Sequence, residues 1–189
     1  MRTLFLQEVD ATVVLADVRD FSPLAQQLGP VDLGMALSRF YEHIGGVVEK
    51  NHGRIVKFIG DGVLAAFIGS KEHRLRALQA IAEGLKSREG FLEENTKMKL
   101  PVLDYAFGAA SGTILAGELG TEKLRFYDIL GAPVNQAFRL TALATRRGVT
   151  NLVAADTFED ADKSKRPAAV EQDMVEMGAD KLRLFKIEG

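Results

Sequence analysis

The sequence has no cysteine and no tryptophan among its 189 residues. The absence of cysteine excludes disulfide bonds, thiolate zinc sites and cysteine nucleophiles. No hydrophobic run approaches the ~20 residues that a membrane-spanning helix requires. The N-terminal residues become polar at Gln7 and Glu8, before the apolar core of a secretory signal peptide is complete. We therefore expect a soluble protein of the cytoplasm, with no membrane segment.

An excess of charge of either sign is also lacking. The 24 Lys and Arg residues nearly balance the 26 Asp and Glu residues, which leaves a net charge of −2. Proteins that bind nucleic acid by neutralising phosphates are strongly basic, so we expect no nucleic-acid partner. Hydrophobic residues make up 47% of the chain, which excludes disorder. The length predicts a single domain over residues 1–189.

The first third of the chain reads as a strand followed by two helices. A β-branched apolar run at residues 12–16 predicts a buried strand that ends at Asp17. Ser22 is a plausible N-cap for a short helix. A longer helix is predicted to end near Gly53, which would take the left-handed conformation. Its apolar stripe repeats every three or four residues, at Leu33, Leu37, Phe40, Ile44 and Val47.

The rest of the chain alternates strands and helices. A three-residue turn, Gly60-Asp61-Gly62, is predicted to join two apolar strands into a hairpin. The order of elements predicts an α+β fold with a ferredoxin-like split-βαβ (βαββαβ) sheet, helices on one face and C-terminal additions. The later elements are predicted as a helix at 73–86, strands at 105–111, 113–119 and 125–130, a helix from Pro133 to Thr145, a loop at 160–167, and strands at 151–154 and 182–187.

Two carboxylates of this fold are predicted to meet. Asp17 ends the first strand and Asp61 lies in the hairpin turn, and the strands that carry them are neighbours in a split-βαβ sheet. Carboxylates that lie close together repel unless a cation lies between them, and Mg²⁺ is a typical one. The alternative is that Asp61 is only a favoured turn residue and Asp17 only a helix cap.

Four other polar residues are ambiguous when each is taken alone. Lys57 interrupts an apolar strand, so it either protects a sheet edge or faces a ligand. Asn135 and Arg139 are four residues apart and share one helix face, which by itself indicates solvent-exposed surface. Asp128 alone reads as an exposed strand residue.

Taken in order, three segments resemble the motifs of class III nucleotidyl cyclases, the adenylate and guanylate cyclase catalytic domains. The resemblance spans residues 11–187. The segments are Leu15-Ala16-Asp17-Val18-Arg19-Asp20-Phe21-Ser22, Lys57-Phe58-Ile59-Gly60-Asp61-Gly62-Val63, and Asp128-Ile129-Leu130-Gly131 followed by Val134, Asn135, Ala137 and Arg139.

The resemblance implies a function for the carboxylates and for the ambiguous residues. Asp17, Asp61 and the Val18 carbonyl would hold two divalent cations, Mg²⁺ or Mn²⁺, that activate the ribose 3′-hydroxyl and neutralise the triphosphate. Lys57 and Asp128 would read the purine edge and select ATP over GTP. The expected activity is the conversion of ATP to 3′,5′-cyclic AMP and pyrophosphate.

Further implied roles concern the phosphates and the partner. Asn135 would position the ribose, and Arg139 would stabilise charge that develops on the α-phosphate. Backbone N–H groups at the helix start would hold a phosphate. Family members work as head-to-tail dimers, so a homodimer would hold two shared active sites. The backbone groups are those of Arg19, Asp20, Phe21 and Ser22.

The sequence departs from the family pattern at three positions. Asp20 stands where a small or neutral residue is usual, and Ala106 and Val175 stand where basic residues often contact the β- and γ-phosphates. These departures leave open a catalytically weak or inactive domain that dimerises and signals, while Lys57 and Asp128 make a guanylate cyclase less favoured. The nearby cations that would substitute are Arg19, Lys123, Arg125 and Lys181.

Overall fold

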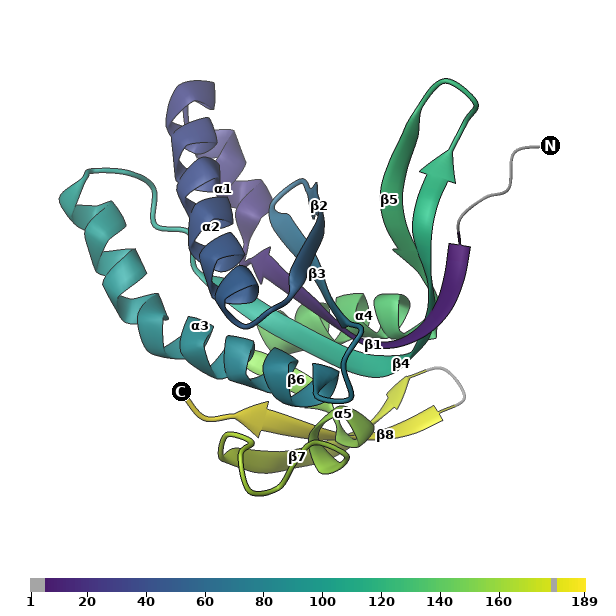
Figure 1. The fold of residues 1–189 in the computed structure, drawn as a ribbon. Coiled ribbons are helices and arrows are strands. Elements are labelled where there is room, and N and C mark those ends of the chain that lie inside the picture. The colour runs from purple at the N-terminus through teal and green to yellow at the C-terminus, as the bar shows by residue number, and fades with distance from the viewer. Residues whose placement is uncertain (1–5, 178–179) are drawn as a thin grey trace.

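The structure is a computed structural model, and it describes residues 6–177 and 180–189. Figure 1 shows one strongly twisted sheet with helices packed against it. The elements in chain order are β1 (Leu6–Val18), α1 (Phe21–Gln27), α2 (Pro30–Lys50), β2 (Arg54–Ile59), β3 (Gly62–Ile68), α3 (His73–Lys97), β4 (Tyr105–Gly120), β5 (Arg125–Leu130), α4 (Ala132–Arg146), β6 (Asn151–Ala154), α5 (Ala155–Glu159), β7 (Ala169–Met177) and β8 (Asp180–Ile187).

The sheet has the strand order β2-β3-β1-β4-β6-β8-β7, and β5 pairs with β4 off this path. The central strand β1 is antiparallel to both β3 and β4, and β6 is parallel to β4. The apolar run at residues 11–16 lies in this central position because it is buried on both faces. The predicted ferredoxin-like α+β class is confirmed.

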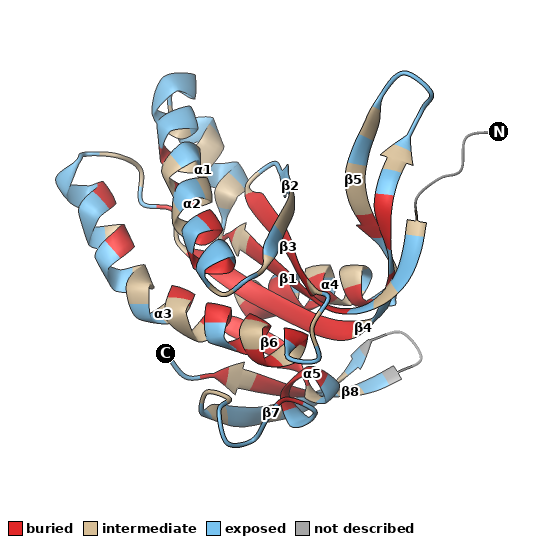
Figure 2. Cartoon of the chain, viewed as in Figure 1, coloured by how far each residue is buried: buried red, intermediate tan, exposed pale blue. Residues whose placement is uncertain are grey.

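Helices cover both faces of the sheet. Phe40 of α2 and Leu78 of α3 pack on one face, in a core cluster with Val14 and Ala16. On the opposite face α4 packs against β4 and β1, through Ala137. The expectation of helices on one face therefore holds for α2 and α3 and is wrong for α4. Figure 2 shows the buried residues concentrated along β1, β3 and β4, between these layers.

The contact between α4 and β4 requires a glycine. A Cβ atom on Gly108 would lie 2.4 Å from the Ala137 carbonyl oxygen and 2.3 Å from Thr141 Oγ1. No side chain fits at that separation, so α4 rests directly on the β4 backbone. This close approach holds α4 across the end of β1, where the candidate site lies.

Two turns differ from their predicted form. After α2, the left-handed residue is His52, with φ 60°, and not Gly53. Gly53 is required for space, because a Cβ there would lie 2.7 Å from the Phe67 ring. The β2–β3 turn has two residues rather than three, since Ile59 pairs with Gly62, and Gly60 takes the left-handed conformation with φ 59°.

Other elements are longer than predicted or were not predicted. The helix α3 continues past Lys86 to Lys97, and β4 runs unbroken through Gly112 from Tyr105 to Gly120. Together β4 and β5 form a hairpin that extends away from the rest of the sheet (Figure 1). Within residues 6–177 and 180–189, no helix is both long enough and apolar enough to cross a membrane.

Candidate active site

A cavity of about 900 Å³ lies at the end of β1, and we call it the carboxylate cavity. Its walls come from the β1 end, the start of α1, the β2–β3 turn and one face of α4. The residues that line it are Asp17, Val18, Asp20, Phe21, Ser22, Pro23, Asp61, Arg139, Ala142, Thr145, Arg146 and Glu176. The cavity contains all three predicted metal-binding residues, and this agrees with the prediction that Asp17 and Asp61 meet.

The β2–β3 turn rests directly on the end of β1. Asp17 pairs with Gly62, and a Cβ on Gly62 would lie 2.8 Å from Asp17 Oδ1. The Val18 backbone N–H donates a hydrogen bond to the Asp61 carbonyl oxygen at 3.2 Å. Sheet pairing therefore brings the two carboxylates into one cavity, although 44 residues separate them along the chain.

Both carboxylates carry their charge in an unfavourable environment. Burial, and then repulsion by Asp61, raises the pKa of Asp17 from 3.8 to about 6. Burial also raises the pKa of Asp61. A positive charge between these groups would relieve both effects.

The cavity as a whole is acidic. It is lined by four carboxylates, those of Asp17, Asp20, Asp61 and Glu176, against two guanidinium groups. The described residues contain no cluster of three or more His, Cys, Asp or Glu with metal-binding geometry. Two carboxylates and a backbone carbonyl are the oxygen donors that Mg²⁺ takes when substrate phosphates supply further ligands. The donor set therefore fits a hard divalent cation.

Three of the four residues predicted to offer backbone N–H groups to a phosphate line the cavity, namely Asp20, Phe21 and Ser22. Asp20 takes the left-handed conformation, with φ 49° and ψ 35°, immediately before α1. The helix has only seven residues, so its dipole adds little, and most phosphate charge would need another counter-charge.

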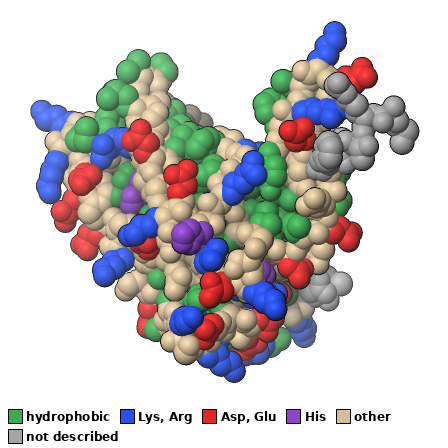
Figure 3. All heavy atoms as spheres, in the orientation of Figure 1, with side chains coloured by type: hydrophobic (Ala, Val, Ile, Leu, Met, Phe, Trp, Pro, Cys, Tyr) green, Lys and Arg blue, Asp and Glu red, His purple; other side chains and the backbone are tan. Residues whose placement is uncertain are grey.

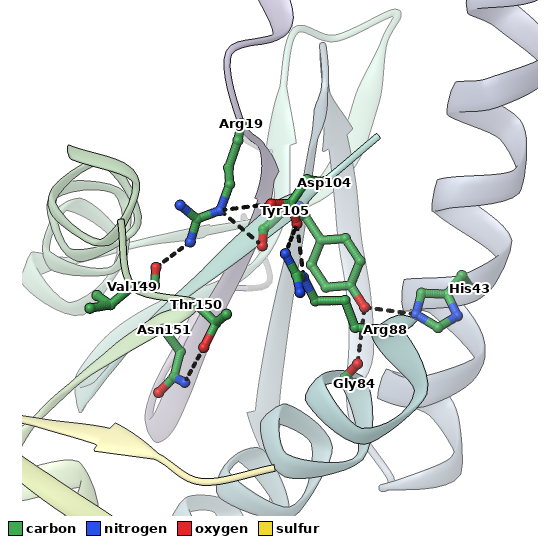
Figure 4. Close-up of polar contacts among 9 residues, drawn as sticks. All are labelled: Arg19, His43, Gly84, Arg88, Asp104, Tyr105, Val149, Thr150 and Asn151. Atoms are coloured by element: carbon green, nitrogen blue, oxygen red, sulfur yellow. Dashed lines mark hydrogen bonds and ion pairs between the residues drawn. The ribbon is translucent and has the colours of Figure 1, made fainter. Parts of the chain in front are cut away.

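Arg19 does not fit the phosphate role. Its backbone N–H donates to the Asp104 carbonyl oxygen at 2.7 Å, and its side chain does not line the cavity. Figure 4 shows the guanidinium instead among Asp104 and the carbonyls of Tyr105 and Val149. The Arg19 backbone N–H that was predicted to hold a phosphate therefore already has an acceptor in this structure.

The positions that lack basic residues are occupied by apolar packing. Ala106 is fully buried in β4, in a cluster to which Val175 adds a partly buried side chain. Neither residue reaches the carboxylate cavity. Two of the basic residues that could replace them in phosphate binding already have partners. Lys181 Nζ lies 3.5 Å from Glu176 Oε1. Arg125 donates to the Thr121 carbonyl on the β4–β5 hairpin.

Lys57 and Asp128 form a pair away from the cavity. Lys57 Nζ donates to Asp128 Oδ2 at 2.7 Å, which joins the edge strand β2 to β5. Both side chains are partly exposed, and neither lines the carboxylate cavity. The structure therefore brings the two predicted base-reading residues together, and it separates them from the metal-binding residues of the same chain.

One face of α4 completes the cavity. Arg139 lines it together with Arg146, whereas Asn135, one turn before Arg139, does not. The sequence reasoning did not identify Arg146. The signal was present, because residues 139, 142 and 146 follow helical spacing and so share a face.

The family model that describes the adenylate and guanylate cyclase catalytic domain matches residues 6–188. An uncharacterized protein of Mycobacterium tuberculosis is 30% identical over 162 residues, which cover 82% of this chain and 28% of that protein. Adenylate cyclase 1 of Rhizobium meliloti is 29% identical over 159 residues, which cover 81% of this chain and 23% of the relative. The chain thus spans about a quarter of the length of these relatives.

Solved structures share the fold at lower identity. The adenylyl cyclase CyaB from P. aeruginosa superposes with a TM-score of 0.86 and 20% identity, covering 98% of this chain and 97% of that one. The guanylyl cyclase Cya2 superposes with a TM-score of 0.86 and 22% identity, covering 96% of this chain and 92% of that one. With the match to the family model over nearly the whole sequence, the chain belongs to the family of adenylate and guanylate cyclase catalytic domains.

Proposed function

We propose that this chain is an adenylate cyclase, which converts ATP to 3′,5′-cyclic AMP and pyrophosphate. The observation that carries the proposal is the Lys57–Asp128 pair at 2.7 Å. It offers an ammonium donor beside a carboxylate acceptor, which complements adenine N1 and the 6-amino group. Guanine has a protonated N1 and a 6-keto oxygen, so it would leave both protein groups mismatched, which strongly disfavours binding.

Asp17, Asp61 and the Val18 carbonyl would hold two divalent cations in the carboxylate cavity. When bound, the cations would neutralise the triphosphate and promote loss of the ribose 3′-hydroxyl proton. The 3′-oxygen forms a bond to the α-phosphorus while the bond to the pyrophosphate oxygen breaks. Arg139 of a second copy of the chain would stabilise the charge that develops on the α-phosphate, and Asn135 of that copy would orient the ribose.

The proposed active unit is a homodimer with two shared sites. Within one chain the base-reading pair does not line the carboxylate cavity, and a second copy would bring the two sets of residues to one nucleotide. Large apolar side chains are exposed where such a copy would pack, as on Phe58 (51%) and Phe126 (62%). Figure 3 shows hydrophobic side chains on both sides of the opening between β2 and the β4–β5 hairpin. This is a large amount of apolar surface for a monomer to expose to water.

The test is product formation at a protein concentration high enough to populate dimers. Purified protein is incubated with ATP or with GTP in the presence of Mn²⁺, and cyclic nucleotides are quantified. We expect cyclic AMP with ATP and little cyclic GMP. Equal turnover of GTP would contradict the assigned base selection, and no product from either nucleotide would contradict the proposed activity.

A catalytically inactive signalling domain is the second candidate. Two observations favour it. Asp20 adds a negative charge to the cavity, and the buried Ala106 stands where a basic residue usually binds a phosphate. Such a domain would dimerise without binding nucleotide. Calorimetric titration with a non-hydrolysable ATP analogue and Mn²⁺ separates the two candidates, because only the enzyme shows cation-dependent binding.

A further inference from the structure

The Arg19 side chain, just after the end of β1, is held by protein groups and does not line the carboxylate cavity. Its Nε lies 3.5 Å from Asp104 Oδ2 and 3.4 Å from the Tyr105 carbonyl oxygen, and its Nη2 donates to the Val149 carbonyl oxygen. Only 13% of the side chain is exposed. A guanidinium with this many protein partners is a structural anchor rather than a free ligand for phosphate.

Asp104 is the centre of the contacts that hold Arg19. Its Oδ1 accepts hydrogen bonds from Arg88 Nε at 2.8 Å and from the Tyr105 backbone N–H at 2.6 Å. Its Oδ2 faces Arg19, so one carboxylate joins α3 to the end of β1 (Figure 4). We call Arg19, Asp104 and Arg88 the Arg–Asp–Arg network.

The network acts on the peptide group between Val18 and Arg19. The N–H of that peptide donates to the Asp104 carbonyl oxygen at 2.7 Å. No peptide bond of the described chain is cis, so the carbonyl of the same peptide, that of Val18, points the opposite way from this N–H. Since Val18 lines the carboxylate cavity, fixing the N–H fixes the carbonyl that is proposed to bind a cation.

We propose that Arg19 is a positioning residue, which uses the Arg–Asp–Arg network to orient the Val18 carbonyl and Asp17 for cation binding. This inference rests on the proposed function. It assigns Arg19 a role different from that of a phosphate ligand, because the residue acts on the cation site through the backbone that it holds. Residues that orient metal ligands from the outer shell typically change metal affinity by roughly 10–100-fold when they are replaced.

The test compares Mn²⁺ affinity with ATP kinetics in two variants. Arg19→Met keeps the apolar stem and removes the guanidinium, and Asp104→Asn keeps the shape and removes the charge. We expect both variants to bind Mn²⁺ roughly 10–100-fold more weakly by calorimetry without nucleotide. At saturating Mn²⁺ we expect the KM for ATP to stay within about twofold of the original value, because only uniform binding of ATP alters KM alone.

A phosphate-binding Arg19 would give the opposite result. Arg19→Met would then raise the KM for ATP at saturating Mn²⁺ and leave Mn²⁺ affinity unchanged. Either of these two results for Arg19→Met overturns the inference. If the original protein binds no Mn²⁺, the proposed function fails and the inference fails with it, whereas equal Mn²⁺ affinity in all variants overturns the inference alone.

Two further variants control for loss of folding. Arg88→Gln alters the network at its outer end on α3 and leaves Arg19 in place, so we expect a smaller loss of Mn²⁺ affinity in the same direction. Arg183→Met removes an arginine that is paired with Glu159 and Glu171, away from the network, and we expect unchanged Mn²⁺ affinity. Thermal unfolding of each variant shows whether it is folded at the titration temperature. A role in stability alone would lower Tm without weakening Mn²⁺ binding in the folded protein.

Discussion

The ionised carboxylate of Asp17 destabilises the fold when no cation is bound. Its pKa is raised to about 6 in the folded chain by burial and by Asp61, above the ordinary value of 3.8. The unfolded chain therefore releases this proton first as the pH rises. The stability contribution of Asp17 is full below about pH 4, is lost between pH 4 and 6, and stays lost above pH 6.

The substitution Asp17→Asn tests how much the ionised carboxylate destabilises the folded chain. At pH 7.5 without divalent cations, we expect the variant to have a Tm higher than the original protein by roughly 2–4 °C, the shift for about 1 kcal/mol in a chain of this size. Near pH 4 the two proteins should differ much less, because Asp17 is then protonated in the folded state. Thermal scans at both pH values make the comparison. A lower Tm for the variant at pH 7.5 would contradict the assigned repulsion.

Mn²⁺ provides the matching measurement. At pH 7.5 the Tm of the original protein should rise with increasing Mn²⁺ concentration, because the cation binds the folded state. The Tm of Asp17→Asn should change little. The effect on the original protein should weaken as the pH falls below about 6, where Asp17 takes up a proton that competes with the cation.

Tyr41 holds the turn that carries Asp61. Its hydroxyl donates to the Gly60 carbonyl oxygen, and its ring stacks on Phe58 with 4.3 Å between centroids. Tyr41→Phe keeps the stacking and removes only the hydrogen bond. We expect a loss of about 1 kcal/mol in the free energy of unfolding, and a Mn²⁺ affinity lower by several-fold.

The control for this variant is Tyr127→Phe, at a tyrosine of β5 that lies outside the β2–β3 turn and whose ring packs under Arg54. It should leave Mn²⁺ affinity unchanged. Calorimetry on both variants decides the matter. If Tyr41→Phe binds Mn²⁺ as tightly as the original protein, the hydroxyl does not position Asp61.

Among the elements, α4 supplies the cations of the carboxylate cavity. Its Arg139 and Arg146 are the two arginines that line the cavity. The positions where other basic residues were expected to bind phosphates hold Ala106 and Val175. We predict that Arg146 binds the β- or γ-phosphate of ATP. Arg146→Gln should raise the KM for ATP by about 10-fold or more, as expected for the loss of a charge-assisted hydrogen bond of roughly 1.5–3 kcal/mol.

Arg147→Gln is the matched control for Arg146→Gln. It changes the next residue, which is exposed and does not line the cavity, and it removes the same charge from the chain. Its KM for ATP should stay close to that of the original protein. Equal effects of the two substitutions would show that general electrostatic attraction, and not a contact from Arg146, accounts for the change.

Elements with strong apolar periodicity could be predicted from the sequence, and polar ones could not. The β-branched run of β1 and the stripe of α2 identified the core of the fold. The second half of α3 is rich in charged residues and presents few apolar side chains, so its extension to Lys97 gave no signal. The strand β7 is largely exposed, and polar residues occupy four of its nine positions, so it has no continuous apolar run and was not predicted.

The candidate site shows the same division. Asp17 and Asp61 could be paired from the sequence because the sheet order of the predicted fold makes their strands neighbours. The separation of Lys57 and Asp128 from the cavity depends on where the β4–β5 hairpin points, which no local pattern encodes. The anchoring of Arg19 depends on Asp104 and Val149, residues 85 and 130 positions away. A local motif does not contain such contacts.

At the scale of the whole molecule, the question is whether one chain or a pair of chains forms each active site. Arg139 lines the same cavity as the carboxylates of its own chain, but Lys57 and Asp128 lie elsewhere. If each active site takes its carboxylates from one copy and its Arg139 from the other, Asp17→Ala and Arg139→Ala are each inactive alone, because every site of either homodimer lacks one essential residue. A mixed dimer instead has one site that lacks both residues and one that is intact.

Mixing the two inactive variants therefore distinguishes the arrangements. Random pairing of equal amounts makes half of the dimers mixed, each with one working site, so about a quarter of the original cyclic AMP production should return. The activity should rise with time after mixing if subunits exchange slowly, and Arg183→Met mixed with Asp17→Ala gives the reference for dilution by an active partner. Sites in which Arg139 acts with the carboxylates of its own chain would give no recovery, because neither variant then supplies both groups. Recovery thus requires that the carboxylates of one copy and the Arg139 of the other act on the same nucleotide.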